Sequence, residues 1–148
     1  MTTLFLADTS AYTVARRLSA AEVRLRALAA DGVLATFVTV DLELGYSARD
    51  PSEHQGIFRT RSQLVQLASI DEIAMRAREV QALMAKRSQH RAAGVMDLLT
   101  AAAAEHYGAS VLHYDADFDH IAAVTGQSVD WVAPRGSVVI GQQACGFR

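Results

Sequence analysis

The segment GVMDLLTAAAAEHYGASVLHYDADFDHIAAV, residues 94–124, determines the expected fold. Its alanine-rich run over residues 96–106 is typical of a helix, and Gly108 ends that helix. Residues 110–113 form a short apolar run that predicts a buried strand, and residues 117–124 predict another helix. A helix, a strand and a helix in immediate succession indicate part of a parallel α/β sheet.

The same alternation continues toward both ends of the chain. Thr9, Ser10, Ser19 and Asp71 are candidate helix N-caps. Strands are expected at residues 4–7, 33–37, 67–70, 110–113 and 128–132. Helices are expected at residues 11–18, 20–30, 53–66, 71–88, 96–106 and 117–124, with a further helix that carries Glu43 and opens at Thr39 or Asp41. This order predicts a three-layer α/β/α sandwich around a short parallel sheet, in one domain over residues 1–134, followed by a tail of uncertain order at 135–148.

Composition places the chain among globular proteins. Of its 148 residues, 51% are hydrophobic and 20% are charged, which suffices for a packed core. The single cysteine, Cys145, excludes an intrachain disulfide and favours a reducing cytoplasm. The N-terminus lacks the basic start of a signal peptide, and no apolar run approaches the length of a membrane span. We therefore expect a cytoplasmic protein that does not enter a membrane.

Five acidic residues stand where apolar runs give way to helices: Asp8, Glu43, Asp97, Asp115 and Asp117. In parallel sheets, ligands bind beyond the carboxyl ends of the strands, so these side chains are expected to meet at one edge. Carboxylates crowded together repel one another unless divalent cations neutralise them. An oxygen-lined site of this kind suits Mg²⁺ or Mn²⁺, whose commonest role is chemistry on phosphate esters.

Each acid also has a purely structural explanation. Asp8 could cap the helix that follows it, and Glu43 could be a solvated helix residue. Asp97 could complement its helix dipole, and the aspartates of the segment at 115–119 could be turn residues. The placement of all of them at element boundaries favours the metal site, and whether Asp119 joins it is left open.

Several other chemistries are excluded by the residues present. An EF-hand loop starting at Asp115 would need glycine and glutamate where the chain has His120 and Gly126. The only lysine, Lys86, follows Ala85, so no phosphate-binding loop of the G-x-x-x-x-G-K type exists. The five histidines lack zinc-site spacing, and no Ser-His or Cys-His pairing supports covalent catalysis.

The net charge of −2 conceals a basic remainder. Without the five acids, 11 acidic residues stand against 14 basic ones, and all of the basic residues except one are arginines. Arginine binds phosphate through two parallel hydrogen bonds, so Arg16, Arg49 and Arg91 are candidates for contacts with flanking phosphates. Ordinary solvated helix faces explain most of the arginines equally well.

The motifs together resemble the PIN-domain family, and within it the VapC-type ribonuclease toxins of prokaryotic toxin–antitoxin pairs. The resemblance covers residues 4–133 and is carried by Asp8 at the end of the first strand, Glu43 in an L-E-L segment, Asp97 in DLLTAAAA and the late segment HYDADFDHIA. It implies a PIN-like fold and an Mg²⁺- or Mn²⁺-dependent endoribonuclease that cleaves structured RNA such as tRNA or rRNA. It also implies a homodimer and a small antitoxin partner.

The resemblance further implies roles for individual residues. Asp8 and Asp97 would be primary metal ligands, with Asp115 and Asp117 near the metal or acting through water. Glu43 and Asp115 would orient or activate the attacking water, and the hydroxyl of Ser10 would support the site; the residues that bind substrate stay unknown. Two alternatives remain: a catalytically silent PIN-like RNA-binding or regulatory module, and a metal-dependent DNA nuclease or phosphatase on a similar scaffold.

Overall fold

The structure is a computed structural model that describes residues 2–138. Its strands are β1 (Leu4–Ala7), β2 (Leu34–Thr36), β3 (Val65–Gln66), β4 (Ala109–His113) and β5 (Val129–Trp131). Its helices are α1 (Thr9–Ala15), α2 (Ser19–Ala30), α3 (Val38–Tyr46), α4 (Pro51–Ser62), α5 (Asp71–Lys86), α6 (Val95–His106) and α7 (Asp117–Thr125). Across residues 2–138 no helix has both the length and the apolar character needed to cross a membrane.

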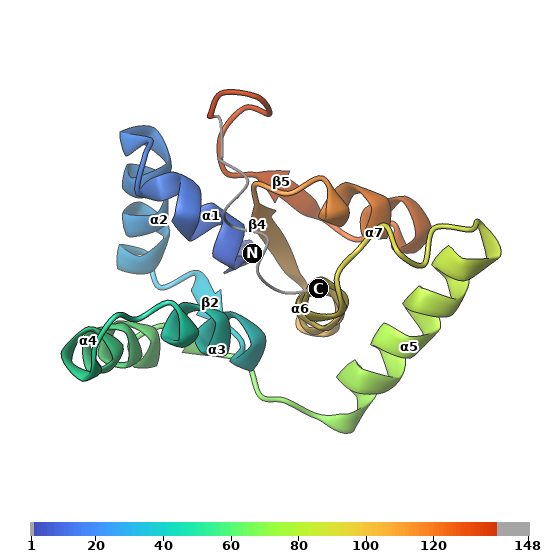
Figure 1. Cartoon of the computed structure of the whole chain (residues 1–148), viewed down its shortest axis with the longest axis horizontal. Helices are drawn as coiled ribbons and strands as arrows, with labels where there is room; N and C mark the ends of the chain where they lie inside the picture. Colours follow the sequence, from blue (N-terminus) through green and yellow to red (C-terminus); the bar gives the residue numbers. More distant parts are fainter. Residues whose placement is uncertain (1, 139–148) are drawn as a thin grey trace.

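The five strands form one parallel sheet in the order β3-β2-β1-β4-β5. Helices α5, α6 and α7 cover one face of the sheet and α1 and α2 cover the other, which confirms the three-layer sandwich (Figure 1). In the central pair, Ala7 lies opposite Leu112, so β1 and β4 end at the same level. The residues that follow these two strands therefore emerge side by side at one edge of the sheet.

Two apolar cores lie on the two faces of the sheet, because successive strand side chains point to opposite faces. Leu6 and Val111 pack toward α5, α6 and α7, whereas Ala7 and Leu112 pack toward α1 and α2. The run Ala101–Ala104 of α6 is buried throughout. Its small side chains let α6 lie close to its neighbours, which places the start of this helix beside the edge where β1 and β4 end.

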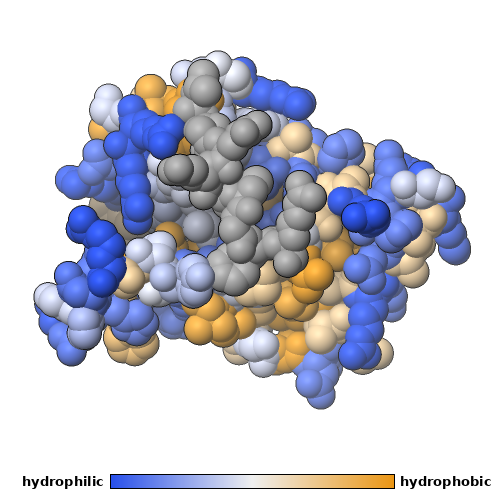
Figure 2. Space-filling model, viewed as in Figure 1, coloured by the Kyte–Doolittle hydropathy of each residue, from blue (hydrophilic) through white to orange (hydrophobic). Residues whose placement is uncertain are grey.

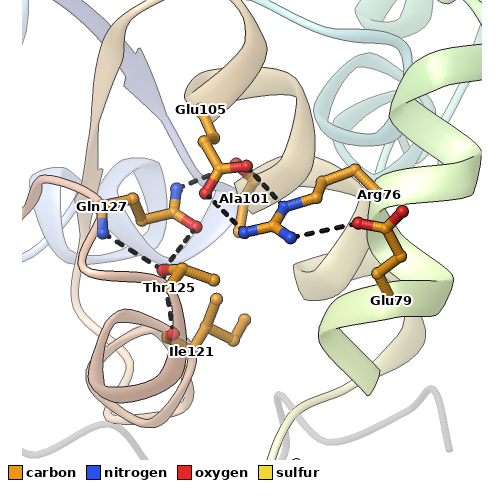
Figure 3. Close-up of polar contacts among 7 residues, drawn as sticks. All are labelled: Arg76, Glu79, Ala101, Glu105, Ile121, Thr125 and Gln127. Atoms are coloured by element: carbon orange, nitrogen blue, oxygen red, sulfur yellow. Dashed lines mark hydrogen bonds and ion pairs between the residues drawn. The ribbon is translucent and has the colours of Figure 1, made fainter. Parts of the chain in front are cut away.

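Polar contacts join α6 to its neighbours on both sides (Figure 3). Nε of Arg76 on α5 donates to Oε1 of Glu105 at 2.7 Å, and its Nη1 donates to Glu79 at 3.1 Å. On the other side, Nε2 of Gln127 donates to the carbonyl oxygen of Ala101 at 2.9 Å, and Thr125 Oγ1 also contacts Gln127. These contacts hold α6 between α5 and the loop that connects α7 to β5.

Most predicted elements are confirmed, and the predicted strand at 67–70 is wrong. The strand of this region is β3, Val65–Gln66, which pairs with Ala35 and Thr36 of β2. The predicted helix over 53–66 instead runs from Pro51 to Ser62, because Asp50 caps it and Pro51 opens it. Leu67 is still buried, so its apolar character marks the core without marking a strand.

The predicted N-caps are also misplaced. Thr9, Ser19 and Asp71 are the first residues of α1, α2 and α5, Ser10 is the second residue of α1, and the caps are the residues before these helices. The third helix starts at Val38, before either of its predicted openings. The domain boundary at 134 stays a prediction: Pro134 begins a turn in which Ser137 N donates to Pro134 O at 3.0 Å, and residues 139–148 of the predicted tail lie outside the described residues.

Candidate functional site

Three of the predicted carboxylates lie together at the carboxyl edge of the sheet. Asp97, Asp115 and Asp117 each offer one oxygen atom, and these atoms all lie within 4.8 Å of one another. Asp97 stands in the first turn of α6, Asp115 follows β4, and Asp117 opens α7. We call these three residues the acidic cluster. It is half-buried and brings together parts of the chain that precede and follow strand β4, which lies between β1 and β5.

Short-range hydrogen bonds fix the turn between β4 and α7. The backbone N–H of Asp117 donates to Oδ1 of Asp115 at 3.0 Å, and the N–H of Asp115 donates to Nδ1 of His113 at 3.1 Å. Both bonds link residues two positions apart, which is the pattern of a side chain that closes a tight turn. The two aspartates of this turn are therefore oriented by backbone contacts as well as by packing.

The carboxyl group of Asp97 has the most perturbed environment of the cluster. Its Oδ2 accepts a hydrogen bond from the N–H of Gly94 at 3.3 Å, which closes the first turn of α6. Burial, the negative charges of Asp8 and Asp115, and the contact with Asp117 together raise its pKa to about 9, with burial the largest cause. In the absence of a cation, this group therefore holds its proton at neutral pH.

Asp8 lies beside the cluster and is itself buried, with 4% of its surface exposed. It is the N-cap of α1, because its Oδ2 accepts from the N–H of Ser10 at 3.0 Å. Burial raises the pKa of Asp8 most, and the charge of Asp115 adds to the rise, while hydrogen bonds from Ser10 oppose it. The structure thus confirms that Asp8 is a cap; its role as a metal ligand stays a prediction, because the acidic cluster consists of Asp97, Asp115 and Asp117.

The predicted supporting residue Ser10 connects α1 to the exit of β4. Its Oγ accepts a hydrogen bond from the N–H of Tyr114 at 2.9 Å, while its own N–H donates to Asp8. The residue after β1 and the residue after β4 are therefore linked through one serine. Its part in catalysis stays a prediction.

Glu43 on α3 approaches the same site from a third direction. Burial raises the pKa of its carboxyl group most, the charge of Asp8 adds to the rise, and the side chain of Thr9 opposes it. Its Oε1 is buried and has no hydrogen-bond partner among residues 2–138. A buried carboxylate oxygen without a partner is costly, so this atom is available for a cation or a water molecule.

The donor set fits a hard divalent cation. It consists of carboxylate oxygens only, which Mg²⁺ and Mn²⁺ prefer over nitrogen or sulfur ligands. Within the described part of the chain, no ion pair to arginine or lysine involves Asp97, Asp115 or Asp117. The unpartnered oxygen of Glu43 and the raised pKa of Asp97 indicate the same need for positive charge.

Asp119, whose membership the sequence left open, is absent from the cluster. Its Oδ1 instead lies 3.9 Å from Nε2 of His113, on the far side of that ring from Asp115. Sequence reasoning missed His113, which is fully buried at the end of β4. Its position two residues before Asp115, at a strand end, was the signal that could have indicated it.

A cavity of about 430 Å³ lies between α1, α2, α3 and α4, and its lining includes Arg16 and Arg61. Arg61 is buried: its Nε contacts Oδ1 of Asp41 at 3.2 Å, and its guanidinium lies 4.4 Å from the centre of the Tyr12 ring. Sequence reasoning missed Arg61.

Arg16 is one of three arginines predicted to contact phosphates. Of the remaining two, Arg49 is paired with Glu53 at 3.0 Å and Arg91 is exposed.

The fold and the cluster define an α/β protein with carboxylates gathered at the carboxyl edge of a parallel sheet. The chain matches the model of the PIN domain over residues 5–124. It is 46% identical over 136 residues to ribonuclease VapC51 of Mycobacterium tuberculosis, covering 90% of this chain and 96% of that protein. It is 42% identical over 139 residues to ribonuclease VapC21 of the same species, covering 93% and 99%. The chain belongs to the PIN-domain family, in the group of the VapC ribonucleases.

Solved structures of low sequence identity share the fold. A chain of the DNA-bound VapBC complex from Salmonella typhimurium superposes with a TM-score of 0.71 at 16% identity, covering 89% of this chain and 100% of that one. A chain of VapBC-5 from Mycobacterium tuberculosis gives a TM-score of 0.57 at 17% identity, covering 88% and 98%. The predicted PIN-like fold is therefore confirmed.

Proposed function

We propose that this protein is an Mg²⁺- or Mn²⁺-dependent endoribonuclease that acts in the cytoplasm as the toxin of a toxin–antitoxin pair. Its substrate would be structured RNA, such as tRNA or rRNA, whose cleavage inhibits translation. The observation that carries the proposal is the acidic cluster, three carboxylate oxygens within 4.8 Å of one another at the edge where β1 and β4 end. The names of the relatives, ribonuclease VapC51 and ribonuclease VapC21, support an activity on RNA.

The acidic residues would have different roles in the proposed reaction. Asp97, Asp115 and Asp117 would hold the cation, with Asp8 as a further ligand or as adjacent negative charge. The cation, when bound, supplies Lewis acidity and offsets the charge of the phosphodiester group. Glu43 and Asp115 would orient the attacking water and accept its proton. Burial and the charge of Asp8 raise the pKa of Glu43, and a carboxylate with a raised pKa accepts a proton more readily, which supports the role of a general base.

Cleavage of a purified substrate tests the metal and the substrate together. The protein is incubated with tRNA, rRNA fragments and single-stranded DNA of matched length, with Mg²⁺ or Mn²⁺ or with excess EDTA. We expect cleavage of RNA that needs the metal. Full activity in EDTA would contradict the metal dependence, whereas metal-dependent cleavage of DNA alone would favour the DNA nuclease.

Expression in a bacterial host separates a toxin from a silent binding module. We expect the wild-type chain to arrest growth and the variant Asp8→Asn to relieve the arrest. Asparagine keeps an oxygen that can cap α1, so this variant removes the charge with less risk to the fold than alanine. Asp31→Asn, at the exposed end of α2, is the matched control and should stay toxic. Equal toxicity of wild type and Asp8→Asn at matched expression would exclude nuclease activity as the cause.

The proposed partner is a small antitoxin that blocks the site. Support comes from the solved structures of similar fold, which include VapBC complexes and a toxin–antitoxin complex from Klebsiella pneumoniae. Co-expression with the product of a small adjacent reading frame should restore growth and yield a complex that copurifies. Failure of every adjacent reading frame to suppress toxicity would oppose the pairing.

A homodimer is part of the same proposal. Val38, Leu42 and Tyr46 are exposed at helical spacing along α3, with 41%, 63% and 74% of their surfaces accessible. Figure 2 shows hydrophobic residues gathered on this face over α3 and beside α6. An apolar stripe of this kind is typical of a surface that a second chain covers. Light scattering should give twice the mass of the chain, and Leu42→Glu should give the monomer; a wild-type monomer would contradict the dimer.

A further inference from the structure

His113 is a fully buried histidine at the end of strand β4. Its ring packs between two aromatic side chains, with ring centres 5.1 Å from Phe118 of α7 and 4.9 Å from Trp131 of β5. Contacts on both sides restrict rotation of the imidazole ring. Its two nitrogen atoms therefore point in fixed directions, one toward Asp115 and the other toward Asp119.

The hydrogen bond to Asp115 determines which nitrogen carries the proton. Nδ1 accepts from the backbone N–H of Asp115 at 3.1 Å, so the ring is neutral and its proton is on Nε2. Nε2 has no hydrogen-bond partner among residues 2–138, but Oδ1 of Asp119 lies 3.9 Å away. The negative charge of Asp119 favours the orientation in which the N–H side of the ring faces it and Nδ1 faces Asp115.

We propose that His113 is a positioning residue of the candidate metal centre, which acts by holding the backbone of Asp115 through Nδ1. The proposal rests on the function proposed above and adds a residue that does not touch the cation itself. The link is short: the Asp115 backbone is held by His113, and Oδ1 of Asp115 in turn accepts from the N–H of Asp117. One imidazole nitrogen thus orients two of the three carboxylates of the acidic cluster.

If His113 served packing alone, a side chain of similar volume without a hydrogen-bond acceptor could replace it. Phenylalanine would fill a similar volume between Phe118 and Trp131, but it would leave the N–H of Asp115 without its acceptor. The bond joins residues two positions apart, a geometry that asparagine also forms readily through its side-chain oxygen. Glutamine extends further and places its amide near the position of Nε2.

This difference provides a matched pair of variants, His113→Asn and His113→Gln. Binding of Mn²⁺ to each purified protein is measured by isothermal titration calorimetry, with thermal unfolding of the metal-free proteins recorded in parallel. We expect His113→Asn to bind Mn²⁺ within about threefold of wild type and His113→Gln to bind at least about tenfold more weakly, as is usual when a residue that orients a metal ligand is lost. His120→Gln, exposed on α7, is the control and should match wild type.

Three results would overturn the positioning role. Equal Mn²⁺ affinity of wild type, His113→Asn and His113→Gln would show that Nδ1 is not needed. If each variant lost Mn²⁺ affinity in proportion to its fall in melting temperature, whether or not its side chain can accept from Asp115, His113 would have a packing role only. An imidazole ¹⁵N spectrum of the metal-free wild type with the proton on Nδ1 would contradict the hydrogen bond directly.

The same measurements separate this inference from the proposed function. If wild type binds no Mn²⁺ and cleaves no RNA, the proposed function fails and the positioning role fails with it. If wild type binds Mn²⁺ and cleaves RNA while both variants do the same at equal metal concentrations, only the role of His113 is wrong. Protection of the Asp115 amide from hydrogen exchange, retained in His113→Asn and lost in His113→Gln, gives a readout that is independent of activity.

Discussion

The backbone N–H of Gly94 donates to Oδ2 of Asp97 at 3.3 Å, so one carboxyl group both closes the first turn of α6 and belongs to the acidic cluster. The two roles make different demands. Closing the turn needs an oxygen acceptor, whereas binding a cation needs negative charge. A substitution that keeps the oxygen and removes the charge therefore separates them.

Asp97→Asn is that substitution. We expect it to reduce RNA cleavage at least about 100-fold, since it removes a charge that the metal requires. Asparagine can still accept from Gly94, and it is uncharged like the protonated carboxyl group of Asp97. The melting temperature without metal should therefore hold at neutral pH and rise at higher pH, where Asp97 would ionise beside Asp8 and Asp115. Activity and melting temperature are measured on the same preparation. A large fall in melting temperature at neutral pH would instead show that the carboxyl group of Asp97 serves the fold.

Gly94→Ala should disturb the same carboxyl group by contact. A Cβ atom at this position would lie 3.1 Å from Oδ2 of Asp97, which is closer than ordinary packing allows. We expect a several-fold loss of Mn²⁺ affinity, measured by calorimetry. Gly56→Ala is the matched control: apart from the backbone of its own helix, no atom lies within 4 Å of its added Cβ, and alanine should stabilise α4 by about 0.5–1 kcal/mol without weakening Mn²⁺ binding. Equal affinity of Gly94→Ala and wild type would argue against a tightly held Asp97.

The metal-free protein should lose stability as pH rises. In the unfolded chain the carboxyl group of Asp97 ionises near its ordinary pKa of 3.8, whereas in the folded protein its pKa is about 9. Between these values the folded state binds more protons than the unfolded chain, so the free energy of unfolding falls with increasing pH. The melting temperature in EDTA should decrease from about pH 5 to about pH 8. Asp97→Asn should flatten this slope, and a slope that is equally steep in the variant would contradict the assignment to Asp97.

Arg61 should contribute strongly to stability because it joins α4 to β2, α3 and α1. Its Nη2 donates to Thr36 at 2.8 Å, its Nε contacts Asp41, and its guanidinium lies over Tyr12. Arg61→Ala leaves polar partners unpaired next to a void, so we expect the free energy of unfolding to fall by about 3 kcal/mol in urea denaturation. The neighbouring exposed Arg59 is the control, and Arg59→Ala should change the stability by less than about 0.5 kcal/mol. Similar effects of the two substitutions would refute this role.

Asp117 and Asp119 should differ although both lie in the first turn of α7. Asp117 contributes an oxygen to the acidic cluster, whereas Asp119 faces His113. We expect Asp117→Asn to weaken Mn²⁺ binding at least about tenfold and Asp119→Asn to weaken it much less. Calorimetric titration of both variants gives the comparison. An equal loss in Asp119→Asn would mean that its carboxylate reaches the cation in the bound state.

The sequence predicted the order of the elements because periodicity and composition are local properties. The strand at 4–7 and the alanine-rich helix were located almost to the residue, since each combines an apolar pattern with clear end signals. The third strand was misplaced for a physical reason. Val65 and Gln66 are exposed at the sheet edge, so their strand leaves no apolar pattern, while the apolar Leu67 beyond them packs into the core outside any strand.

The candidate site was predictable only in part. Carboxylates at strand ends could be expected to converge, and the structure brings Asp97, Asp115 and Asp117 within one small volume. The sequence could not show that Asp8 caps α1 as well, because that depends on one backbone N–H. Nor could it separate Asp119 from its neighbours, since only the direction of each side chain distinguishes them.

The site depends on the pairing of β1 with β4, and this pairing also determines when during protein synthesis the site can form. Asp8 follows β1, near the start of the chain, whereas Asp115 and Asp117 follow β4, more than a hundred residues later. A ribosome that makes this protein therefore exposes Asp8 long before the other carboxylates have been synthesised. The carboxylates can meet only after β4 has also left the ribosome, so the proposed activity can arise no earlier than the folding of β4 against β1.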